Sequence, residues 1–308
     1  MASIVRKHLL TKGDAVTTGQ LRHRAVGIGT VVLTGALALS ACGATKSSTS
    51  SSTTALDKIK KAGVINIATD ASYAPNEFKQ NGKIVGFDVD LGNAIAQKIG
   101  VKAQFSDVTF DNILPALTSG KYDISLSSFT DSKKREASFD FVTYFSAGES
   151  LIVKTGNPLK LSTSGLSLCG QKIAVEKTTT EESDIKAGGD IYKRCTEAGK
   201  KAPEALSFDT EDQANLALSS GRSVGILADS PVAAYAVKQS GGKFVVADAG
   251  YGAAPYGIAI PQKEPELRDA ILKAVKDMVA DGSFKQISDK WGVSSGDITN
   301  PQVNGATS

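Results

Sequence analysis

Short apolar runs alternate with amphipathic segments through most of the chain. Strand-like apolar runs lie at residues 64–68, 101–105 and 122–126. Between them, residues 88–99 and 110–117 place an apolar side chain every three or four positions, which predicts helices. Alternation of strands and helices is typical of parallel sheets covered by helices, so we expect an α/β fold.

The same alternation recurs in the second half of the chain. The pattern predicts strands at 172–175 and 224–228, with a helix at 211–219 between them. A long helical pattern follows over residues 265–291 and is broken at Gly282. The chain therefore contains two successive sets of helices and strands.

Two of these helix–strand units are alike in detail. Residues 116–121 read ALTSGK and residues 217–222 read ALSSGR, and each stretch ends a helix at a glycine before a strand begins. The first strand ends at Ser127 and Ser128, and the second ends at Asp229. Ligands of open α/β sheets bind beyond the carboxyl ends of strands, so two facing units would form a cleft for a small polar molecule. Two ordinary helix–strand units are the alternative interpretation.

Charge is unevenly distributed along the 308 residues, of which 41% are hydrophobic. Residues 1–41 carry five basic side chains and one acidic one, which leaves a net charge of −1 for residues 42–308. The remainder therefore lacks the basic pattern of a nucleic-acid-binding protein. Both histidines, His8 and His23, lie in the first segment. Their position excludes Ser-His-Asp catalysis and His-ligated metal sites after residue 41, and we expect no metal or cofactor.

Residues 25–39 form an uncharged, mostly apolar run of 15 residues preceded by two arginines. The run is shorter than the ~20 residues that span a membrane and is typical of a secretory signal, with a buried core helix as the alternative. Residues 39–43, Leu-Ser-Ala-Cys-Gly, resemble the lipobox of bacterial lipoproteins. The resemblance implies cleavage before Cys42 and a lipid on its sulfur, so residues 1–41 would be a lipoprotein signal peptide.

Residues 47–54 are eight consecutive serines and threonines, a composition typical of a flexible linker. We expect residues 42–56 to tether an exported body to the outer face of the cytoplasmic membrane. Cys169 and Cys195 are then the only cysteines of that body. In an oxidising compartment an even pair favours a disulfide, and two buried free thiols are the alternative.

A set of short segments carries a family likeness across residues 57–300. In chain order they are residues 70–75 (DASYAP), 86–91 (GFDVDL), 114–123 (LPALTSGKYD), 127–130 (SSFT), 139–141 (FDF), 177–180 (KTTT), 227–230 (LADS) and 281–292. Their order and spacing resemble the family-3 solute-binding proteins, the amino-acid receptors of ABC importers. The resemblance implies a two-lobe α/β fold of the type 2 periplasmic-binding-protein class, with two hinge crossings and a ligand cleft between the lobes.

The resemblance also implies where the lobes divide. The first crossing would lie near residues 146–148 and the return near residues 252–255. Lobe 1 would then comprise residues 57–146 and 254–308. Lobe 2 would comprise residues 147–253 and contain both cysteines of the body.

The resemblance further implies a site for an α-amino acid. Arg135 matches the arginine that binds the ligand α-carboxylate, for which its planar fork is suited, and a surface arginine is the alternative. Asp229 matches the carboxylate that pairs with the α-ammonium, although an aspartate before Ser-Pro is also a good helix N-cap. The other implied contacts, to the α-carboxylate and to the aliphatic part of the ligand, are Ser127, Ser128, Thr130, Thr179, Thr180, Tyr73 and Phe110.

Asp70 is the position that bears on specificity. In relatives that bind lysine, arginine, ornithine or histidine, an acidic residue at this place meets the distal cation; a turn role for Asp70 is the alternative. Glu77 and Glu149 are further acidic candidates near the mouth of the cleft. The sequence departs from the family pattern at Asn76, where phenylalanine is usual, and at Thr178, where glycine is common.

We therefore expect a receptor rather than an enzyme. A polar or cationic amino acid would bind between the lobes, the hinge would close, and the closed monomer would dock on an ABC permease. The sequence contains no G-x-x-x-x-G-K-[ST] motif, so ATP hydrolysis would belong to another subunit. The alternative is an exported lyase of the cyclohexadienyl dehydratase type, with Asp229 or Asp70 as the acid or base.

Overall fold

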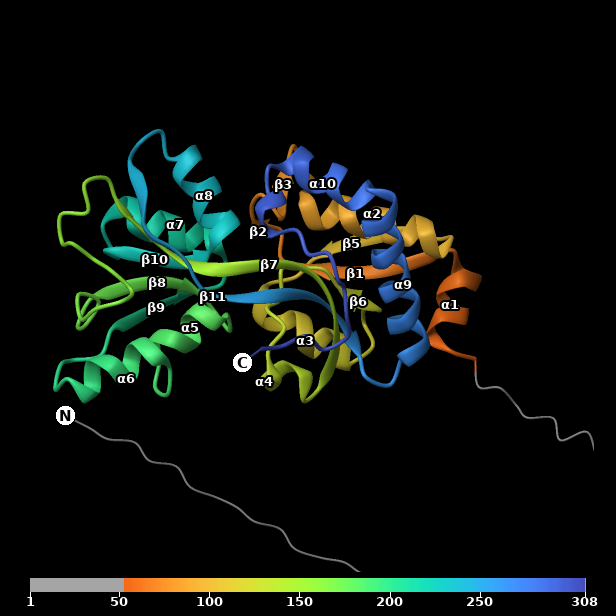
Figure 1. Ribbon diagram of the computed structural model, residues 1–308, viewed down its shortest axis with the longest axis horizontal. Coiled ribbons are helices and arrows are strands. Elements are labelled where there is room, and N and C mark those ends of the chain that lie inside the picture. Colours follow the sequence, from red (N-terminus) through yellow and green to blue (C-terminus); the bar gives the residue numbers. More distant parts are fainter. Residues whose placement is uncertain (1–52, 308) are drawn as a thin grey trace, which may run out of the picture. The chain divides into compact units, whose positions relative to one another are not determined.

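An eight-stranded mixed sheet runs through residues 53–307, the part of the chain that the computed structural model describes (Figure 1). The strand order is β5-β1-β6-β11-β7-β10-β8-β9. The strands are β1 (Val64–Thr69), β5 (Lys102–Asp107), β6 (Ile124–Ser125), β7 (Phe139–Lys154), β8 (Lys172–Glu176), β9 (Glu204–Phe208), β10 (Gly225–Asp229) and β11 (Phe244–Pro261). The expected signal peptide, Cys42 and most of the expected linker lie outside the described residues.

Helices cover both halves of this sheet, and a small second sheet contains β2 (Ser72–Tyr73), β3 (Glu77–Gln80) and β4 (Lys83–Val85). The helices of the first half and the C-terminal part are α1 (Ala55–Ala62), α2 (Phe87–Ile99), α3 (Phe110–Thr118), α4 (Lys133–Glu136), α9 (Pro265–Asp281) and α10 (Ser283–Trp291). Those of the second half are α5 (Thr180–Ile185), α6 (Asp190–Glu197), α7 (Glu211–Ser220) and α8 (Ser230–Gln239). The predicted helices and strands are confirmed to within a few residues.

One boundary differs from the expectation. Thr54 caps α1 with its side chain and forms a capping box with Asp57. Residues 55 and 56, expected to end the linker, are instead the first two residues of that helix.

The sheet is mixed rather than wholly parallel. β1 pairs in parallel with β5 and β6, and β8 pairs in parallel with β9 and β10, as expected. However, β7 and β11 pair antiparallel with each other and with β10 and β6 respectively. β7 is buried along almost its whole length. Burial on both faces is typical of a fully covered strand and does not reveal its direction.

The two long strands, β7 with 16 residues and β11 with 18, connect the two halves (Figure 1). Apolar core clusters lie on either side of them, one group around Ile65 and Phe87 and another around Ile152 and Ile173. Ala147 pairs with Ala254 where the two strands pass between the halves, and the register of β11 is irregular from Val246 to Ala254 and again after Tyr256. This is the two-lobe fold with two hinge crossings, and the exact lobe limits stay a prediction.

Gly148 sits at this crossing in close contact with the opposite strand. A β-carbon there would lie 2.5 Å from the carbonyl carbon of Gly250. Gly148→Ala should therefore force the crossing strands apart and lower the free energy of unfolding by about 1–3 kcal/mol. Urea unfolding measures the loss. Gly165→Ala is the matched control, because its β-carbon would meet nothing within 4 Å; equal effects of the two substitutions would contradict the prediction.

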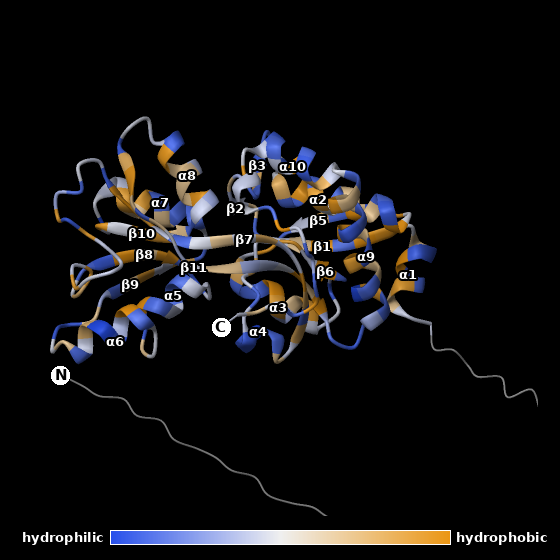
Figure 2. Ribbon diagram, viewed as in Figure 1, coloured by the Kyte–Doolittle hydropathy of each residue, from blue (hydrophilic) through white to orange (hydrophobic). Residues whose placement is uncertain are grey.

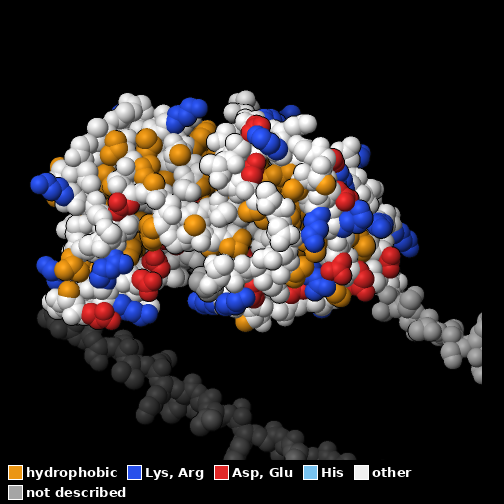
Figure 3. Space-filling view, viewed as in Figure 1, with side chains coloured by type: hydrophobic (Ala, Val, Ile, Leu, Met, Phe, Trp, Pro, Cys, Tyr) orange, Lys and Arg blue, Asp and Glu red, His pale blue; other side chains and the backbone are white. Residues whose placement is uncertain are grey.

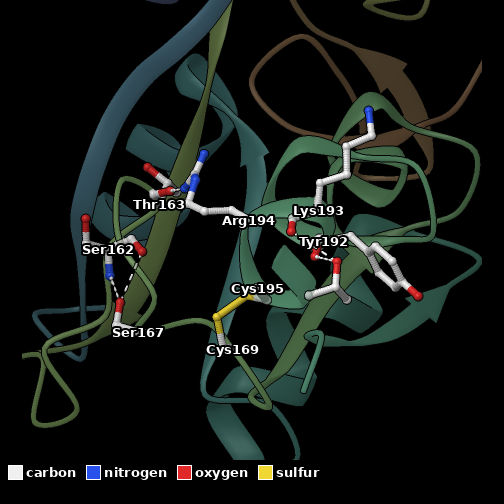
Figure 4. Close-up of a disulfide and its surroundings, with 9 residues drawn as sticks. Ser162, Thr163, Ser167, Cys169, Tyr192, Lys193, Arg194 and Cys195 are labelled. Atoms are coloured by element: carbon white, nitrogen blue, oxygen red, sulfur yellow. Dashed lines mark hydrogen bonds between the residues drawn. A yellow bond between two sulfur atoms is a disulfide. The ribbon is translucent and has the colours of Figure 1, made fainter. Parts of the chain in front are cut away.

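The expected disulfide is present (Figure 4). Cys169 lies in the loop before β8, and Cys195 is a buried residue of α6. Their Cα atoms are 5.5 Å apart. The bond ties α6 to the start of the second half of the sheet and confirms the prediction made from the cysteine count.

Hydropathy follows the layers of the fold. Figure 2 shows apolar residues along the strands and on the helix faces that pack against them. Acidic and basic side chains are interspersed over the face in Figure 3. Within residues 53–307, no helix combines the length and the apolar character needed to cross a membrane.

Candidate functional site

A pocket forms where four strands end. Asp70 follows β1, Ser127 follows β6, and Glu176 and Asp229 are the last residues of β8 and β10. The lining consists of Asp70, Tyr73, Glu77, Phe110, Ser127, Ser128, Thr130, Arg135, Glu176, Thr179, Thr180, Glu181 and Asp229. All ten ligand-contact residues expected from the sequence are among these thirteen. Ser127, Ser128 and Asp229, which end the two similar helix–strand units of the sequence, thus lie together at the carboxyl ends of strands.

Arg135 spans the two lobes. Its Nη1 donates to the carbonyl oxygen of Thr130 at 2.8 Å, and its Nη2 donates to that of Thr178 at 3.1 Å. The guanidinium carbon lies 5.0 Å from the ring centre of Phe129 and 5.5 Å from that of Phe110. These contacts fix the plane of the guanidinium in the lining of the pocket. Burial lowers the pKa of Arg135 to about 10, so the group remains cationic at neutral pH.

Asp229 faces Tyr73 across the pocket. The Tyr73 hydroxyl donates to Oδ2 of Asp229 at 3.0 Å and accepts from the Asp229 backbone N–H at 3.1 Å. Asp229 occupies the N-cap position of α8, but its side chain makes no capping hydrogen bond. Burial, and secondly the charge of Glu181, raises the pKa of Asp229 well above its usual value. The side chain is thus directed to the pocket rather than to the helix.

Asp70 combines the turn role with a place in the lining. Its Oδ1 accepts from the Ser72 hydroxyl at 2.7 Å, and its Oδ2 accepts from the Phe110 backbone N–H at 2.8 Å. The Asp70 backbone N–H donates to Oγ of Ser127 at 2.8 Å. These bonds hold the carboxylate rigidly, and burial raises its pKa.

Ser127 and Ser128 are oriented by two buried carboxyl groups beneath them. Their hydroxyls donate to Oε1 and Oε2 of Glu77 at 3.2 and 3.3 Å. Oδ2 of Asp88 accepts from the Ser128 backbone N–H at 2.9 Å and from the Tyr144 hydroxyl at 2.7 Å. Burial raises the pKa of Glu77 well above its usual value and that of Asp88 to about 6. Glu77 therefore lines the pocket mainly as a support for the serines.

The two departures from the family pattern have local structural roles. Asn76 does not form a wall of the pocket; its side-chain amide donates to Oγ of Ser128 at 2.9 Å. Thr178 has a φ of 63°, so it adopts the left-handed conformation that glycine would adopt more easily. Its backbone N–H donates to Oε2 of Glu182 at 2.8 Å, and its carbonyl receives Arg135. The strained residue thus presents an acceptor to the arginine.

Two lining carboxyl groups were missed from the sequence, Glu176 and Glu181. Glu176 is 3% exposed and Glu181 is 2% exposed. One oxygen of each, Oε1, has no hydrogen-bond partner within the described part of the chain. Burial raises the pKa of both groups. Glu176 directly follows the strand predicted at 172–175, just as Asp229 follows the strand predicted at 224–228. That position is the sequence signal that could have identified Glu176.

Glu149 does not line this pocket. It lies in a neighbouring cavity of about 380 Å³ that shares Thr130, Thr180 and Asp229 with the pocket. Its Oε2 accepts from the Tyr251 hydroxyl at 2.7 Å, and burial raises its pKa to about 10. Glu149 is therefore next to the hinge rather than part of the lining.

Comparison with known proteins shows the family. The family model for bacterial extracellular solute-binding proteins, family 3, matches residues 65–294. The chain belongs to that family. Among curated relatives, the arginine-binding protein ArgT of Corynebacterium glutamicum is 32% identical over 252 residues, 80% of each chain. The L-arginine-binding protein of Pseudomonas aeruginosa is 32% identical over 236 residues, 74% of this chain and 87% of the relative.

Solved structures support the assignment of this chain to family 3 of the solute-binding proteins. An ancestral arginine-binding protein bound to arginine is 36% identical, with a TM-score of 0.68, and the match covers 74% of this chain and 98% of that one. A mutant of the ArgBP protein from T. maritima is 28% identical, with a TM-score of 0.69 and coverage of 77% and 98%. The family and the two-lobe fold expected from the sequence are confirmed.

Proposed function

We propose that this family-3 protein is an extracytoplasmic receptor for a cationic amino acid, which it delivers to the permease of an ABC importer. One observation carries the preference for a cation. Five carboxyl groups line the pocket, whereas Arg135 is the one positively charged side chain in the lining described above. A buried carboxylate is costly unless it meets a cation or a proton. The lining therefore favours a ligand that brings more positive than negative charge.

The groups divide into a zwitterion site and a distal site. Arg135 offers its fork to the α-carboxylate, aided by Thr130 and Thr180, and Asp229 receives the α-ammonium in place of the Tyr73 hydroxyl. Phe110 packs on the aliphatic part. Asp70 and Glu176 are then left for the distal end of the ligand. A guanidinium, with five N–H donors, suits several acceptors at once.

The names of the relatives support this choice. Those from C. glutamicum and P. aeruginosa are described as arginine-binding. A glutamine-binding protein of Bacillus subtilis is also similar, at 30% identity over 234 residues, covering 74% of this chain and 80% of the relative. Arginine and glutamine share an α-amino-acid end and differ in the charge of the distal group. The carboxyl groups of the lining are therefore the features that would favour arginine over glutamine.

Closure of the hinge would complete the site. The ligand would first meet Arg135 and Thr130 in lobe 1, and Asp229 and Thr180 would then reach it from lobe 2. The ligand shifts the open–closed equilibrium because it binds the closed form better. The protein would act as a monomer that presents its closed form to the permease.

Membrane attachment is part of the same proposal. Cleavage after residue 41 and acylation of Cys42 would hold the receptor at the outer face of the cytoplasmic membrane. Intact-mass analysis of protein purified from membranes should show the diacylglyceryl group. Cys42→Ser should release the protein into the medium, and retention of that variant on the membrane would contradict the anchor.

Ligand binding is tested by calorimetry of residues 43–308 with arginine, lysine, ornithine, citrulline and glutamine. Cationic amino acids should bind most tightly. Because burial raises the pKa of Asp70, Glu176 and Asp229, protons compete with the ligand cation. The affinity for arginine should therefore fall as the pH falls from 8 to 5, by up to about tenfold per pH unit for each proton displaced. Binding of neutral amino acids alone would contradict the proposal.

A second candidate function has one specific observation behind it. An ancestral amino-acid-binding protein described as a precursor of cyclohexadienyl dehydratase is 35% identical, with a TM-score of 0.68 and coverage of 77% of this chain and 98% of that one. Glu181 is a buried pocket carboxyl with a raised pKa, a property of general acids. Incubation with hydroxylated cyclohexadienyl carboxylates distinguishes the candidates, because a receptor leaves them unchanged, whereas a lyase releases water and carbon dioxide as the ring becomes aromatic.

A further inference from the structure

We propose that residues 302–306, the C-terminal strap, position Arg135 for the α-carboxylate of the ligand, and that Asp131 is the positioning residue that links the two. The strap contributes nothing to the pocket lining described above, so it acts through α4, the helix that carries Arg135. The inference rests on the proposed function, because it concerns the residue that receives the α-carboxylate there.

α4 is a single helical turn. It spans Lys133–Glu136, and Ser132 caps it by accepting from the Arg135 backbone N–H. The start of a helix fixes several backbone angles for each hydrogen bond formed, so a helix this short depends on packing against the rest of the fold. The position of Arg135 is therefore set by what holds the ends of α4.

The C-terminal strap holds both ends of that turn. Oδ2 of Asp131, which precedes α4, accepts from the Gly305 backbone N–H at 2.7 Å. Oε1 of Glu136, the last residue of α4, accepts from the Ala306 backbone N–H at 3.1 Å. Figure 1 shows the C-terminus beside α4. Two consecutive N–H groups of the strap thus bind the residues on either side of Arg135.

The strap is itself fixed to β7. The Thr143 backbone N–H donates to the carbonyl oxygen of Gln302 at 2.9 Å. The Asn304 backbone N–H donates to the carbonyl oxygen of Phe141 at 2.8 Å, and Oδ1 of Asn304 accepts from the Phe141 backbone N–H at 2.8 Å. β7 is buried along almost its whole length. The strap therefore connects α4 to a rigid part of the sheet.

Asp131 is a fully buried carboxyl group, with an exposed fraction of 0%. Its Oδ1 has no hydrogen-bond partner within residues 53–307. Burial raises the pKa of Asp131 to about 7, against the lowering effect of the Gly305 N–H. Its backbone N–H donates to the carbonyl oxygen of Pro255 on β11 at 2.8 Å. Removal of the carboxyl group would leave the Gly305 N–H without its acceptor and detach the strap from this end of α4.

The strap matters for binding because it orders Arg135 before the ligand arrives. Stacking on Phe110 and Phe129 restrains only the guanidinium end of the side chain. The strap restrains the backbone on either side of it. A binding group that is ordered in advance loses less freedom when the complex forms, and this raises affinity. Loss of the strap should consequently weaken every ligand that has an α-carboxylate.

The test compares arginine with agmatine, which is arginine without its α-carboxylate, by titration calorimetry of the wild type and Asp131→Ala. The dissociation constant for arginine should rise about tenfold in the variant, because Arg135 must then be ordered on binding. The constant for agmatine should stay the same. Asp131→Asn keeps an acceptor oxygen for the Gly305 N–H and resembles the protonated acid, so it should restore most of the arginine affinity.

Asp123→Ala is the matched control. Oδ2 of Asp123 accepts from the Asn66 backbone N–H at 2.7 Å, which is the same kind of bond, in the turn between α3 and β6. This variant should lower the melting temperature and leave the affinity for arginine unchanged. It shows what loss of such a bond does where Arg135 is not involved.

Asn304→Gly tests the strap from its other side. The change removes the side-chain bonds to the Phe141 N–H and to Asp140, and glycine readily keeps the φ of 54° at this position. The variant should weaken arginine binding without affecting agmatine. It decides the question should Asp131→Ala not fold.

The outcomes separate the two proposals. If the wild type binds arginine and folded Asp131→Ala binds it equally well, the strap does not position Arg135, and the receptor function stands. Equal weakening of arginine and agmatine would also overturn the proposal, because the effect would not pass through the α-carboxylate. If the wild type binds no amino acid, the proposed function itself fails.

Non-additivity gives an independent measurement. Because Asp131 acts through Arg135, the Asp131→Ala, Arg135→Ala double variant should bind arginine as weakly as Arg135→Ala alone. Titration at high ligand concentration measures both constants. A further loss in the double variant, equal to the loss that Asp131→Ala causes by itself, would show that Asp131 acts independently of Arg135 and would contradict the proposal.

Discussion

Replacing Arg135 with alanine is expected to weaken binding of the amino acid about 1,000-fold. The guanidinium provides two charge-assisted hydrogen bonds to the α-carboxylate, and removal of one partner from a buried charge pair costs about 4 kcal/mol. Every α-amino acid should be affected alike, because the α-carboxylate is common to all of them. Isothermal titration calorimetry measures the loss.

The controls for Arg135 isolate its geometry from its charge. Lys134→Ala removes a neighbouring exposed positive charge and should leave the affinity unchanged. Arg135→Lys keeps the charge but loses the planar fork and the stacking on Phe129 and Phe110, so its affinity should fall between wild type and alanine. Affinity of Arg135→Ala within tenfold of wild type would show that the zwitterion site has been placed wrongly.

Removal of the disulfide is expected to lower the free energy of unfolding by about 3 kcal/mol. Cys169 and Cys195 are separated by 26 residues in sequence. A cross-link over a loop of that length restricts the unfolded chain by about this amount. For a protein of this size, the loss corresponds to roughly 6–12 °C in melting temperature. The Cys169→Ala, Cys195→Ala double variant measures it by thermal unfolding.

Reductant provides the control for this second prediction. It should destabilise the wild type by a similar amount and leave the double variant unaffected. Arginine affinity measured well below the melting temperature should change little, because neither cysteine lines the pocket. An unchanged melting temperature in the double variant would show that the bond restricts a segment that is already ordered in the unfolded state.

The elements and most of the site could be predicted from the sequence for a common reason. Helices and strands are amphipathic or apolar with a period that burial imposes, so patterns such as 88–99 and 211–219 coincide with α2 and α7. Arg135 and Asp229 belong to short segments whose residue types resemble those of a known family. Asp229 enters the pocket from the carboxyl end of β10, in line with the rule for ligands of α/β sheets, whereas Arg135 enters it from α4.

Glu176 and Glu181 show where prediction from the sequence stopped. A glutamate at the end of a strand or in the first turn of a helix is ordinarily exposed, and the chain has many such residues. Nothing local distinguishes the buried ones. In the folded protein Glu176 is buried in the pocket lining beside other carboxyl groups, and its Oε1 has no hydrogen-bond donor within residues 53–307.

The residue pattern by itself determined the alternating helices and strands and the cysteine pair, because these depend on side-chain type and near spacing. The expectation of a zwitterion site came from the resemblance to a known family. The tertiary structure alone decided the antiparallel direction of β7 and β11 and the concentration of carboxyl groups around one arginine. Strand direction and burial depend on the path of the chain between distant segments. That path brings β1 and β8 to opposite sides of one cleft, and no local pattern records it.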